Sequence, residues 1–191
     1  MYNYKNRDRI RWIIVISLWT FFLAVALSFI AHYFLNELQS IAISFLILLL
    51  VVMAGILFDL IGTSAAAAKI APLNAKAARK VNGAKWGVKL VKNAEKVATF
   101  CNDVGGDISG IISGTMVTVI VIKLVMAFSH QQAEFYLGIL LTAVIAALTV
   151  GGKAWGKIIA INYSTEVILI VGLILTKLHQ PFRWFKKGDS V

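Results

Sequence analysis

The sequence predicts an all-α integral membrane protein with four transmembrane helices plus amphipathic juxtamembrane helices. Of its 191 residues, 59% are apolar and only 15% are charged, and the mean hydropathy is +0.81. Soluble domains carry about 25% charged residues, and a soluble chain of this size leaves too much surface exposed to bury so much apolar area. Several uninterrupted apolar stretches of about 20 residues decide the class, because backbone groups at bilayer depth must be paired within helices.

The first predicted span covers residues 12–32 and follows four basic residues between positions 5 and 11. At about 1.5 Å per residue, ~20 helical residues cross the ~30 Å hydrocarbon core of a bilayer. A secretory signal peptide also begins with basic residues, and residues 24–26 (Ala-Val-Ala) have the composition of a cleavage site. The apolar run is longer than the usual signal core of about 7–15 residues, which favours a span that is not cleaved.

Three more spans are predicted at residues 41–60, 104–128 and 135–150, the last of them short at 16 residues. Short polar connections at 36–40 and 129–134 separate the first span from the second and the third from the fourth. The sequence therefore predicts four helices that cross the membrane.

The distribution of Lys and Arg predicts the orientation of these spans. Neither short polar connection contains a basic residue, whereas the N-terminus, the segment 63–102 and the region after Gly151 contain nearly all of them. Basic residues remain on the cytoplasmic side of a membrane. We therefore expect a multi-pass protein of the bacterial inner (plasma) membrane with both termini in the cytoplasm.

Residues 158–176 are apolar enough to suggest a fifth span, but the polar residues 162–166 interrupt them. The nine continuous apolar residues that remain are too few to cross. We instead predict a membrane-embedded or interfacial helix over 164–179 that ends before Pro181, because proline breaks helices. A basic cytoplasmic tail, residues 182–191, follows it.

The segment 63–102 is basic, with eight Lys or Arg residues and one acid, Glu95. Four of its lysines recur every three or four residues and form one stripe on a helix: Lys85, Lys89, Lys92 and Lys96. Residues 73–81 form a second short basic piece, so we expect two amphipathic helices in the cytoplasmic interface. The net charge of +10 would indicate nucleic acid in a soluble protein. In a membrane protein it indicates contact with anionic lipid instead, and we expect no nucleic acid partner.

Ionisable groups at membrane depth are costly and mark candidate functional residues. Asp59 lies near the end of the second predicted span, and Asp103 and Asp107 lie about one helical turn apart at the start of the third. Asn102 and Ser109 lie beside these two aspartates. Carboxylate, amide and hydroxyl oxygens are ligands that Mg²⁺ or Na⁺ accepts. We therefore predict a cation site at the start of the third span.

Three glycines spaced by four residues, Gly106, Gly110 and Gly114, lie on the same predicted helix and allow close approach of another helix. An alternative stays open: the glycines only pack helices, and Asp103 and Asp107 only cap a helix at the water boundary. The single cysteine and the three separated histidines exclude a disulfide framework and a zinc site. Without a nucleophile–base pair or a phosphate-binding motif, we expect no enzyme and no cofactor other than bound Mg²⁺ or Na⁺.

Four stretches occur in an order that is typical of one family of membrane proteins. They are FDLIGTS at 58–64, the basic run VNGAKWGVKLVKNAEKV, the polar run CNDVGGDISGIISG and the turn GGKAWGKIIA. With them, the region from Phe58 to Pro181, about two thirds of the chain, resembles the transmembrane domain of the CNNM/CorC family of magnesium transporters. The polar run carries the most specific part of the resemblance.

The resemblance implies a homodimer that binds dehydrated Mg²⁺ among hydroxyl, amide and carboxylate oxygens. It places Asp59 at a family serine position, Ser64 at a nearby small-residue position, and residues 102–109 in the Asn- and Ser-rich stretch. The sequence departs from the family at Gly62, where the family often has an acid or amide, and at Gly152, where the family's turn has its Glu. It also has an additional first span, and we expect no regulatory CBS domains.

We therefore expect an N-terminal additional span with a short external loop at 1–40, a CNNM/CorC-like domain at 41–181 and the basic tail at 182–191. The expected function is a membrane cation transporter or cation-binding protein, with Mg²⁺ as the ion that the resemblance implies. Two alternatives remain: a non-transporting scaffold or subunit of an unknown membrane partner, and an exporter of another cation such as a polyamine.

Overall fold

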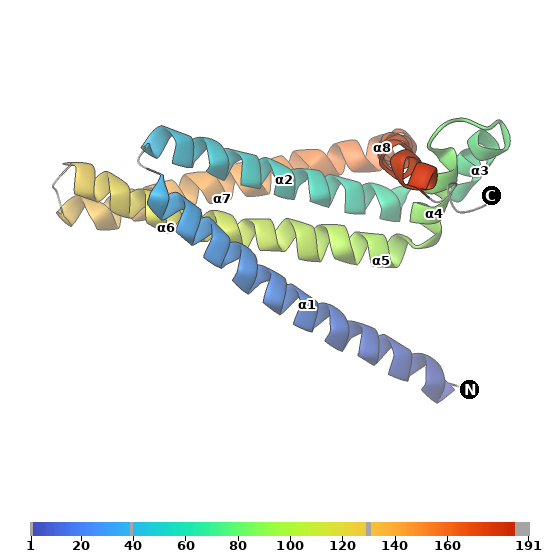
Figure 1. Ribbon diagram of the computed structural model, residues 1–191, viewed down its shortest axis with the longest axis horizontal. Helices are drawn as coiled ribbons and strands as arrows, with labels where there is room; N and C mark the ends of the chain where they lie inside the picture. The colour runs from blue at the N-terminus through green and yellow to red at the C-terminus, as the bar shows by residue number, and fades with distance from the viewer. Residues whose placement is uncertain (1, 39, 129–130, 186–191) are drawn as a thin grey trace. The chain divides into compact units, whose positions relative to one another are not determined.

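The computed structural model describes residues 2–38, 40–128 and 131–185, and this part of the chain is helical with no strand (Figure 1). The helices in chain order are α1 (Tyr2–Glu37), α2 (Ile41–Ala67), α3 (Ile70–Ala78), α4 (Ala84–Lys92), α5 (Ala94–Ala98), the π-helical stretch η1 (Thr99–Asp107), α6 (Ile108–Phe128), α7 (Gln131–Asn162) and α8 (Ser164–Phe185). The predicted all-α fold is confirmed.

Four helical segments in the described part of the chain are long and apolar enough to cross a membrane: Ile10–Phe34, Ile41–Ala67, Ala94–Ala127 and Tyr136–Asn162. The four predicted spans correspond to them, and α8 is not among them. The predicted ends at Leu60 and Val150 are too early, because α2 and α7 continue to Ala67 and Asn162. Polar residues mark where an apolar run stops, but they do not stop a helix that packs against neighbours.

The chain divides into two compact units, residues 1–55 with 107–149 and residues 56–106 with 150–191. In the first unit, α1 contacts α6. The Lys123 ammonium of α6 donates a hydrogen bond to the carbonyl of Leu38, directly after α1. Toward the N-terminus α1 diverges from α6 (Figure 1), and its described side chains are mostly exposed. Apolar exposure of this extent is expected of a helix that faces lipid.

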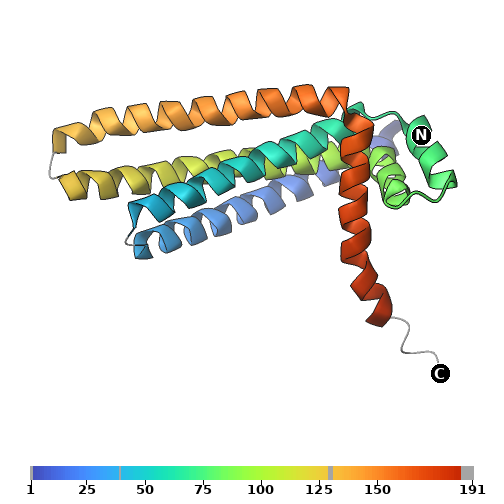
Figure 2. The same cartoon turned by 90° about the horizontal axis from the view of Figure 1, so that it is seen from above.

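The second unit consists of the C-terminal part of α2, the helices α3, α4 and α5, η1 as far as Gly106, the C-terminal part of α7, and α8. Its core is formed by Ala65 of α2, Ala68 directly after α2, Leu73 of α3 and Ile168 of α8. The amphipathic helices α3 and α4 pack against each other, and α4 also packs on α8. Figure 2 shows α8 turning sharply away from the end of α7.

Two glycines bring the backbones of α4 and α8 together. Gly83, at the start of α4, has φ +84°, and a Cβ built on it would lie 2.6 Å from the Leu173 backbone nitrogen. A Cβ built on Gly172 of α8 would collide with the Gly83 carbonyl oxygen and lie 3.1 Å from the Gly87 nitrogen. Only residues without a side chain allow this approach, and the first also needs the left-handed backbone that glycine adopts freely.

The predicted single lysine stripe is interrupted at Asn93. The Asn93 side-chain amide donates to the Lys89 carbonyl at 2.9 Å and ends α4. Lys96 therefore lies on the separate helix α5. The Lys89 ammonium lies 4.7 Å from the centre of the Trp86 ring, so the cation and the indole share a face.

The prediction that the last helix ends before Pro181 is wrong, because α8 begins at Ser164 and continues to Phe185. Proline removes one backbone donor, and a helix can continue past that single lost bond. Of the predicted tail 182–191, residues 186–191 lie outside the described residues.

Candidate functional site

The second unit contains a buried carboxylate with a lysine beside it. Asp59 of α2 is 4% exposed, and its Oδ2 atom lies 3.7 Å from the ammonium of Lys157 on α7. The Lys157 side chain is half exposed, at 52%. At 3.7 Å the two groups attract each other electrostatically but form no hydrogen bond. Oδ2 accepts no hydrogen bond from any described residue. The carboxylate is therefore charge-paired, yet its buried oxygen can still accept a donor or a cation.

A second lysine of α7 reaches the π-helical stretch. Lys153 lies one turn before Lys157, so the two lysines share a face of α7. The Lys153 ammonium donates a hydrogen bond to the carbonyl oxygen of Gly106 in η1 at 3.2 Å. Single turns of π-helix occur often at functional sites. Both lysines therefore point to polar atoms of the neighbouring helices.

The third contact joins η1 to α2 at a glycine. A Cβ built on Gly62 would collide with Oδ1 of Asn102 and lie 2.8 Å from its Cγ. Oδ1 is buried and accepts no hydrogen bond within the part of the chain that the structure describes. Gly62 is three residues after Asp59 and thus its neighbour on α2. The missing side chain at this position places the Asn102 amide on the face of α2 that carries Asp59.

These contacts close a ring of three helices, which we call the three-helix site: Asp59 and Gly62 of α2, Asn102 and Gly106 of η1, and Lys153 and Lys157 of α7. Asp59 and Lys157 join α2 to α7, Lys153 and Gly106 join α7 to η1, and Asn102 and Gly62 join η1 to α2. The arrangement contains two buried oxygens without a hydrogen-bond partner in the described chain and two ammonium groups. A positively charged group can bind where the lysine ammonium groups lie, beside Oδ2 of Asp59 and the carbonyl oxygen of Gly106.

Ser64 is buried at 0% exposure but lies elsewhere on α2. It follows Asp59 by five residues, which is about 140° around a helix of 3.6 residues per turn. Its hydroxyl forms no hydrogen bond with the described residues. Other hydroxyls in the described helices donate to a carbonyl three or four residues earlier, among them those of Thr20, Ser44, Ser113, Thr115, Thr118, Thr149 and Thr176. The unpaired hydroxyl of Ser64 is unusual, but the geometry does not bring it to the three-helix site.

The two aspartates that the sequence places at the start of the third span have exposed side chains, Asp103 in the second unit and Asp107 in the first. Ser109 is half-buried and also belongs to the first unit. Of the predicted oxygen ligands, the structure thus brings Asp59 and Asn102 together in one unit, and the exposed Asp103 of the same unit is not among the residues of the three-helix site. A role for Asp103, Asp107 or Ser109 in ion binding stays a prediction.

The predicted glycine face behaves differently at its two ends. Gly106 is buried within the three-helix site. A Cβ built on Gly110 or Gly114 would have no described atom within 4 Å. Gly152 packs against the side chain of Ile56. No larger side chain fits at Gly152 unless Ile56 moves.

The part of the chain that is described contains no group of three His, Cys, Asp or Glu residues that could hold a metal ion. A cation in the three-helix site would therefore depend on one carboxylate, an amide and backbone carbonyls. Sequence analysis did not identify Lys153 and Lys157 as site residues. Two lysines four residues apart within an apolar helix were the signal that could have revealed them.

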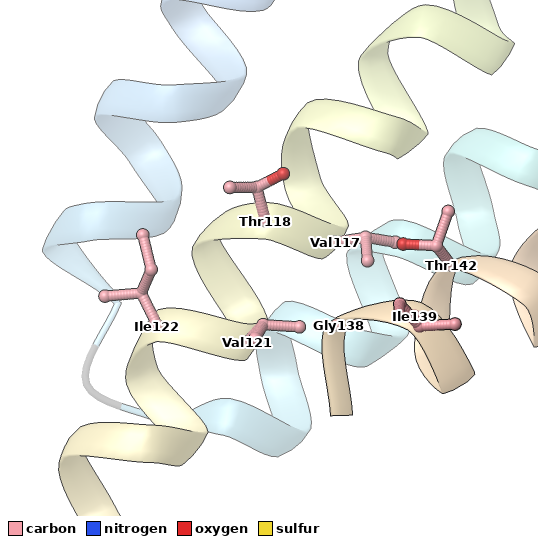
Figure 3. A pocket seen from close by; sticks show the side chains of 7 residues that line it. All are labelled: Val117, Thr118, Val121, Ile122, Gly138, Ile139 and Thr142. Carbon is pink, nitrogen blue, oxygen red and sulfur yellow. The ribbon is translucent and has the colours of Figure 1, made fainter. Parts of the chain in front are cut away.

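A separate pocket of about 310 Å³ lies in the first unit between α6 and α7 (Figure 3). Its lining is formed by Val117, Thr118, Val121, Ile122, Gly138, Ile139 and Thr142. These side chains are apolar or carry a hydroxyl, and Thr118 donates its hydroxyl hydrogen to the Gly114 carbonyl. The pocket offers no ionisable group among its lining residues and suits an apolar occupant such as an acyl chain.

No family model, no curated protein and no solved structure matches this chain.

Proposed function

We propose that the chain is a membrane cation-binding protein of the CNNM/CorC type that moves a cation across the bacterial plasma membrane, with both termini in the cytoplasm. One observation carries the proposal: Oδ2 of Asp59 and Oδ1 of Asn102 are buried and accept no hydrogen bond from the described residues. A buried oxygen without a partner costs about 1–3 kcal/mol. A cation between these oxygens would recover that free energy.

The donor set favours a hard cation. Carboxylate, amide and carbonyl oxygens suit Mg²⁺ and Na⁺, and the family resemblance implies Mg²⁺. The Lys157 ammonium competes with such an ion for Asp59, because it lies 3.7 Å from the carboxylate. An entering ion must therefore displace the ammonium, and the half-exposed Lys157 side chain has room to move away.

Removing the buried carboxylate is expected to abolish ion binding. Titration of the full chain in neutral detergent with Mg²⁺, and separately with Na⁺, should raise the melting temperature of the wild type. Asp59→Asn should weaken the apparent ion affinity at least about tenfold, because a charge-assisted contact contributes about 1.5–3 kcal/mol. The matched control Asp103→Asn removes an exposed carboxylate of the same unit and should retain the shift. Equal shifts in both variants, or no shift in the wild type, would contradict the proposal.

Ser64→Ala is expected to leave ion binding unchanged and to raise the free energy of unfolding by about 1 kcal/mol, because it removes a buried hydroxyl without a partner. Denaturant unfolding in detergent measures the stability, and the same ion titration measures binding. If Ser64→Ala instead weakens ion binding as much as Asp59→Asn does, Ser64 belongs to the site and our placement of it is wrong.

A second candidate function is a non-transporting scaffold or subunit of a membrane partner. The observation that favours it is that Lys153 and Lys157 already contact polar atoms of the three-helix site. Two fixed ammonium groups can replace a mobile ion and hold three helices together permanently. Flux of Mg²⁺ into proteoliposomes above the background of empty vesicles distinguishes the two functions. A polyamine added as competitor tests the third possibility, export of an organic cation.

The homodimer that the resemblance implies remains part of the proposal. Gly110 and Gly114 of α6 leave space for a second helix, since no described atom lies within 4 Å of a Cβ built on either residue. Small residues at four-residue spacing are typical of helix contacts in membranes. We therefore propose that a second copy of the chain packs against this face of α6.

A further inference from the structure

The second unit carries another pocket, outside the three-helix site, where α3, α4 and α8 meet. Its volume is about 340 Å³. It is lined by Lys80, Val81, Asn82, Gly83, Lys85, Trp86 and Thr176. Lys80 to Gly83 form the turn between α3 and α4, Lys85 and Trp86 belong to the first turn of α4, and Thr176 comes from α8. The turn between α3 and α4, the first turn of α4 and the middle of α8 (these helices are labelled in Figure 1) thus line one small volume.

The pocket is positively charged. Two of its seven lining residues are lysines, and none of those seven is acidic. The surrounding segment 63–102 contains eight Lys or Arg residues and a single acid, Glu95, which lies on α5. The first turn of a helix adds partial positive charge from its backbone amides. The pocket therefore favours an anion.

The backbone around the pocket is fixed in place. Lys80 adopts φ +57°, a left-handed conformation that a lysine rarely takes, and Gly83 follows with φ +84°. These two residues turn the chain back between α3 and α4. The close approach of Gly83 to Gly172 then attaches the turn to α8. Pocket residues from the turn and from α8 are therefore held at a constant separation.

The polar groups of the lining match a phosphate ester. Lys80 and Lys85 supply ammonium groups and Asn82 supplies an amide, and all three can donate to a phosphate. Phosphate accepts several such hydrogen bonds at once. The Thr176 hydroxyl already donates to the Gly172 carbonyl at 2.7 Å, so it can only accept from a ligand, and the amide of Asn82 can donate.

Apolar groups at the same pocket distinguish a lipid from a soluble phosphate. Val81 lines the pocket and is 44% exposed, and Trp86 contributes an indole ring. Tryptophan is enriched where the head groups of a bilayer meet the hydrocarbon, and basic pockets next to membrane helices bind anionic head groups. A soluble anion would gain no binding free energy from contact with Val81 and the Trp86 ring.

We propose that this pocket binds the phosphate head group of an anionic phospholipid. The lipid phosphate lies between Lys80 and Lys85, and its glycerol and acyl portion contacts Val81 and Trp86. A bound lipid of this kind anchors α3 and α4 in the membrane interface and supports the core around Leu73 and Ile168. The proposal is independent of ion binding at the three-helix site.

Lipid binding to the full chain in neutral detergent can be counted by native mass spectrometry during titration with phosphatidylglycerol, and in parallel with zwitterionic phosphatidylcholine. The wild type should bind the first phosphatidylglycerol molecule more tightly than further phosphatidylglycerol molecules. The first phosphatidylcholine molecule should bind no more tightly than those that follow it. The double variant Lys80→Gln/Lys85→Gln should weaken this binding about tenfold or more, since each basic residue at a membrane surface contributes about fivefold.

The matched control Lys69→Gln/Lys92→Gln removes the same charge from exposed positions of the same unit outside the pocket. It should weaken binding by no more than about threefold. Thr176→Val changes no charge and should weaken binding of phosphatidylglycerol about threefold, because it deletes a hydroxyl that can accept from the glycerol hydroxyls of the head group. Equal losses in the two double variants, with no effect of Thr176→Val, would show diffuse surface attraction and overturn the proposal.

Competition with soluble anions identifies the source of the phosphate. Inorganic phosphate and glycerol phosphate should displace the lipid only at concentrations far above that of the lipid, because they lack the apolar contacts. Displacement by glycerol phosphate at equal concentration would assign the pocket to a soluble phosphate ester and overturn the lipid proposal. The melting temperature of each variant, measured in the same detergent, confirms that the compared proteins are folded.

Discussion

Gly172→Ala is expected to lower the free energy of unfolding by about 3 kcal/mol, at the upper end of the usual cost of overpacking. A methyl group at this position would collide with the carbonyl oxygen of Gly83 and lie 3.1 Å from the Gly87 nitrogen. Both are backbone atoms, so no side-chain rotation can relieve the overlap. The α4 and α8 backbones must separate, and the core around Leu73 and Ile168 opens with them.

Denaturant unfolding in mild detergent measures this loss, and hydrogen exchange locates it in α4 and α8. Gly151→Ala is the matched control, because a Cβ at Gly151 would have no described atom within 4 Å. Alanine is a better helix former than glycine by about 1 kcal/mol, so this control should leave the protein unchanged or slightly more stable. Similar losses in the two variants would mean that the close approach of α4 and α8 does not stabilise the fold.

Lys157→Met is expected to act in opposite directions on stability and on ion affinity. Without ions the protein should lose about 2 kcal/mol, because buried Asp59 loses its positive partner, although the half-exposed lysine reduces the cost that a fully buried pair would show. The apparent affinity for Mg²⁺ should rise about thirtyfold, since the ion no longer has to displace an ammonium that stabilises the ion-free protein by the same ~2 kcal/mol. Melting temperatures with and without the ion measure both effects in one experiment.

Two further variants make this prediction specific. Lys69→Met removes an exposed lysine and should change neither quantity. Asp59→Asn added to Lys157→Met should erase the gain in affinity, because the carboxylate for which ion and ammonium compete is absent. If Lys157→Met alone weakens the response to Mg²⁺, the lysine is a permanent structural partner of Asp59, and the scaffold function gains the support that transport loses.

The candidate site could be predicted only in part. Asp59 and Asn102 are identifiable from sequence because a polar residue in or next to an apolar span costs free energy, and this cost does not depend on which helices the span packs against. Asp103 and Asp107 satisfied the same rule equally well, yet their side chains are exposed. The rule identifies a residue that is costly to place in the membrane, but it does not say in which direction the side chain points. At the start of the third span, the π-helical stretch Thr99–Asp107 also changes the angle between successive residues, so a face assigned from α-helical spacing does not hold there.

The sequence by itself determined the class of the protein, the four long apolar helices and the basic amphipathic segment between the second and the third. These features depend on the composition of runs of neighbouring residues, and a single sequence contains that information. Only the tertiary structure decided which polar groups meet. Lys157 beside Asp59, Lys153 on the carbonyl of Gly106, and Gly83 against Gly172 are each far apart in the chain. Contacts of this kind depend on how the helices pack, and that packing requires positions without a side chain, such as Gly62, Gly83 and Gly172.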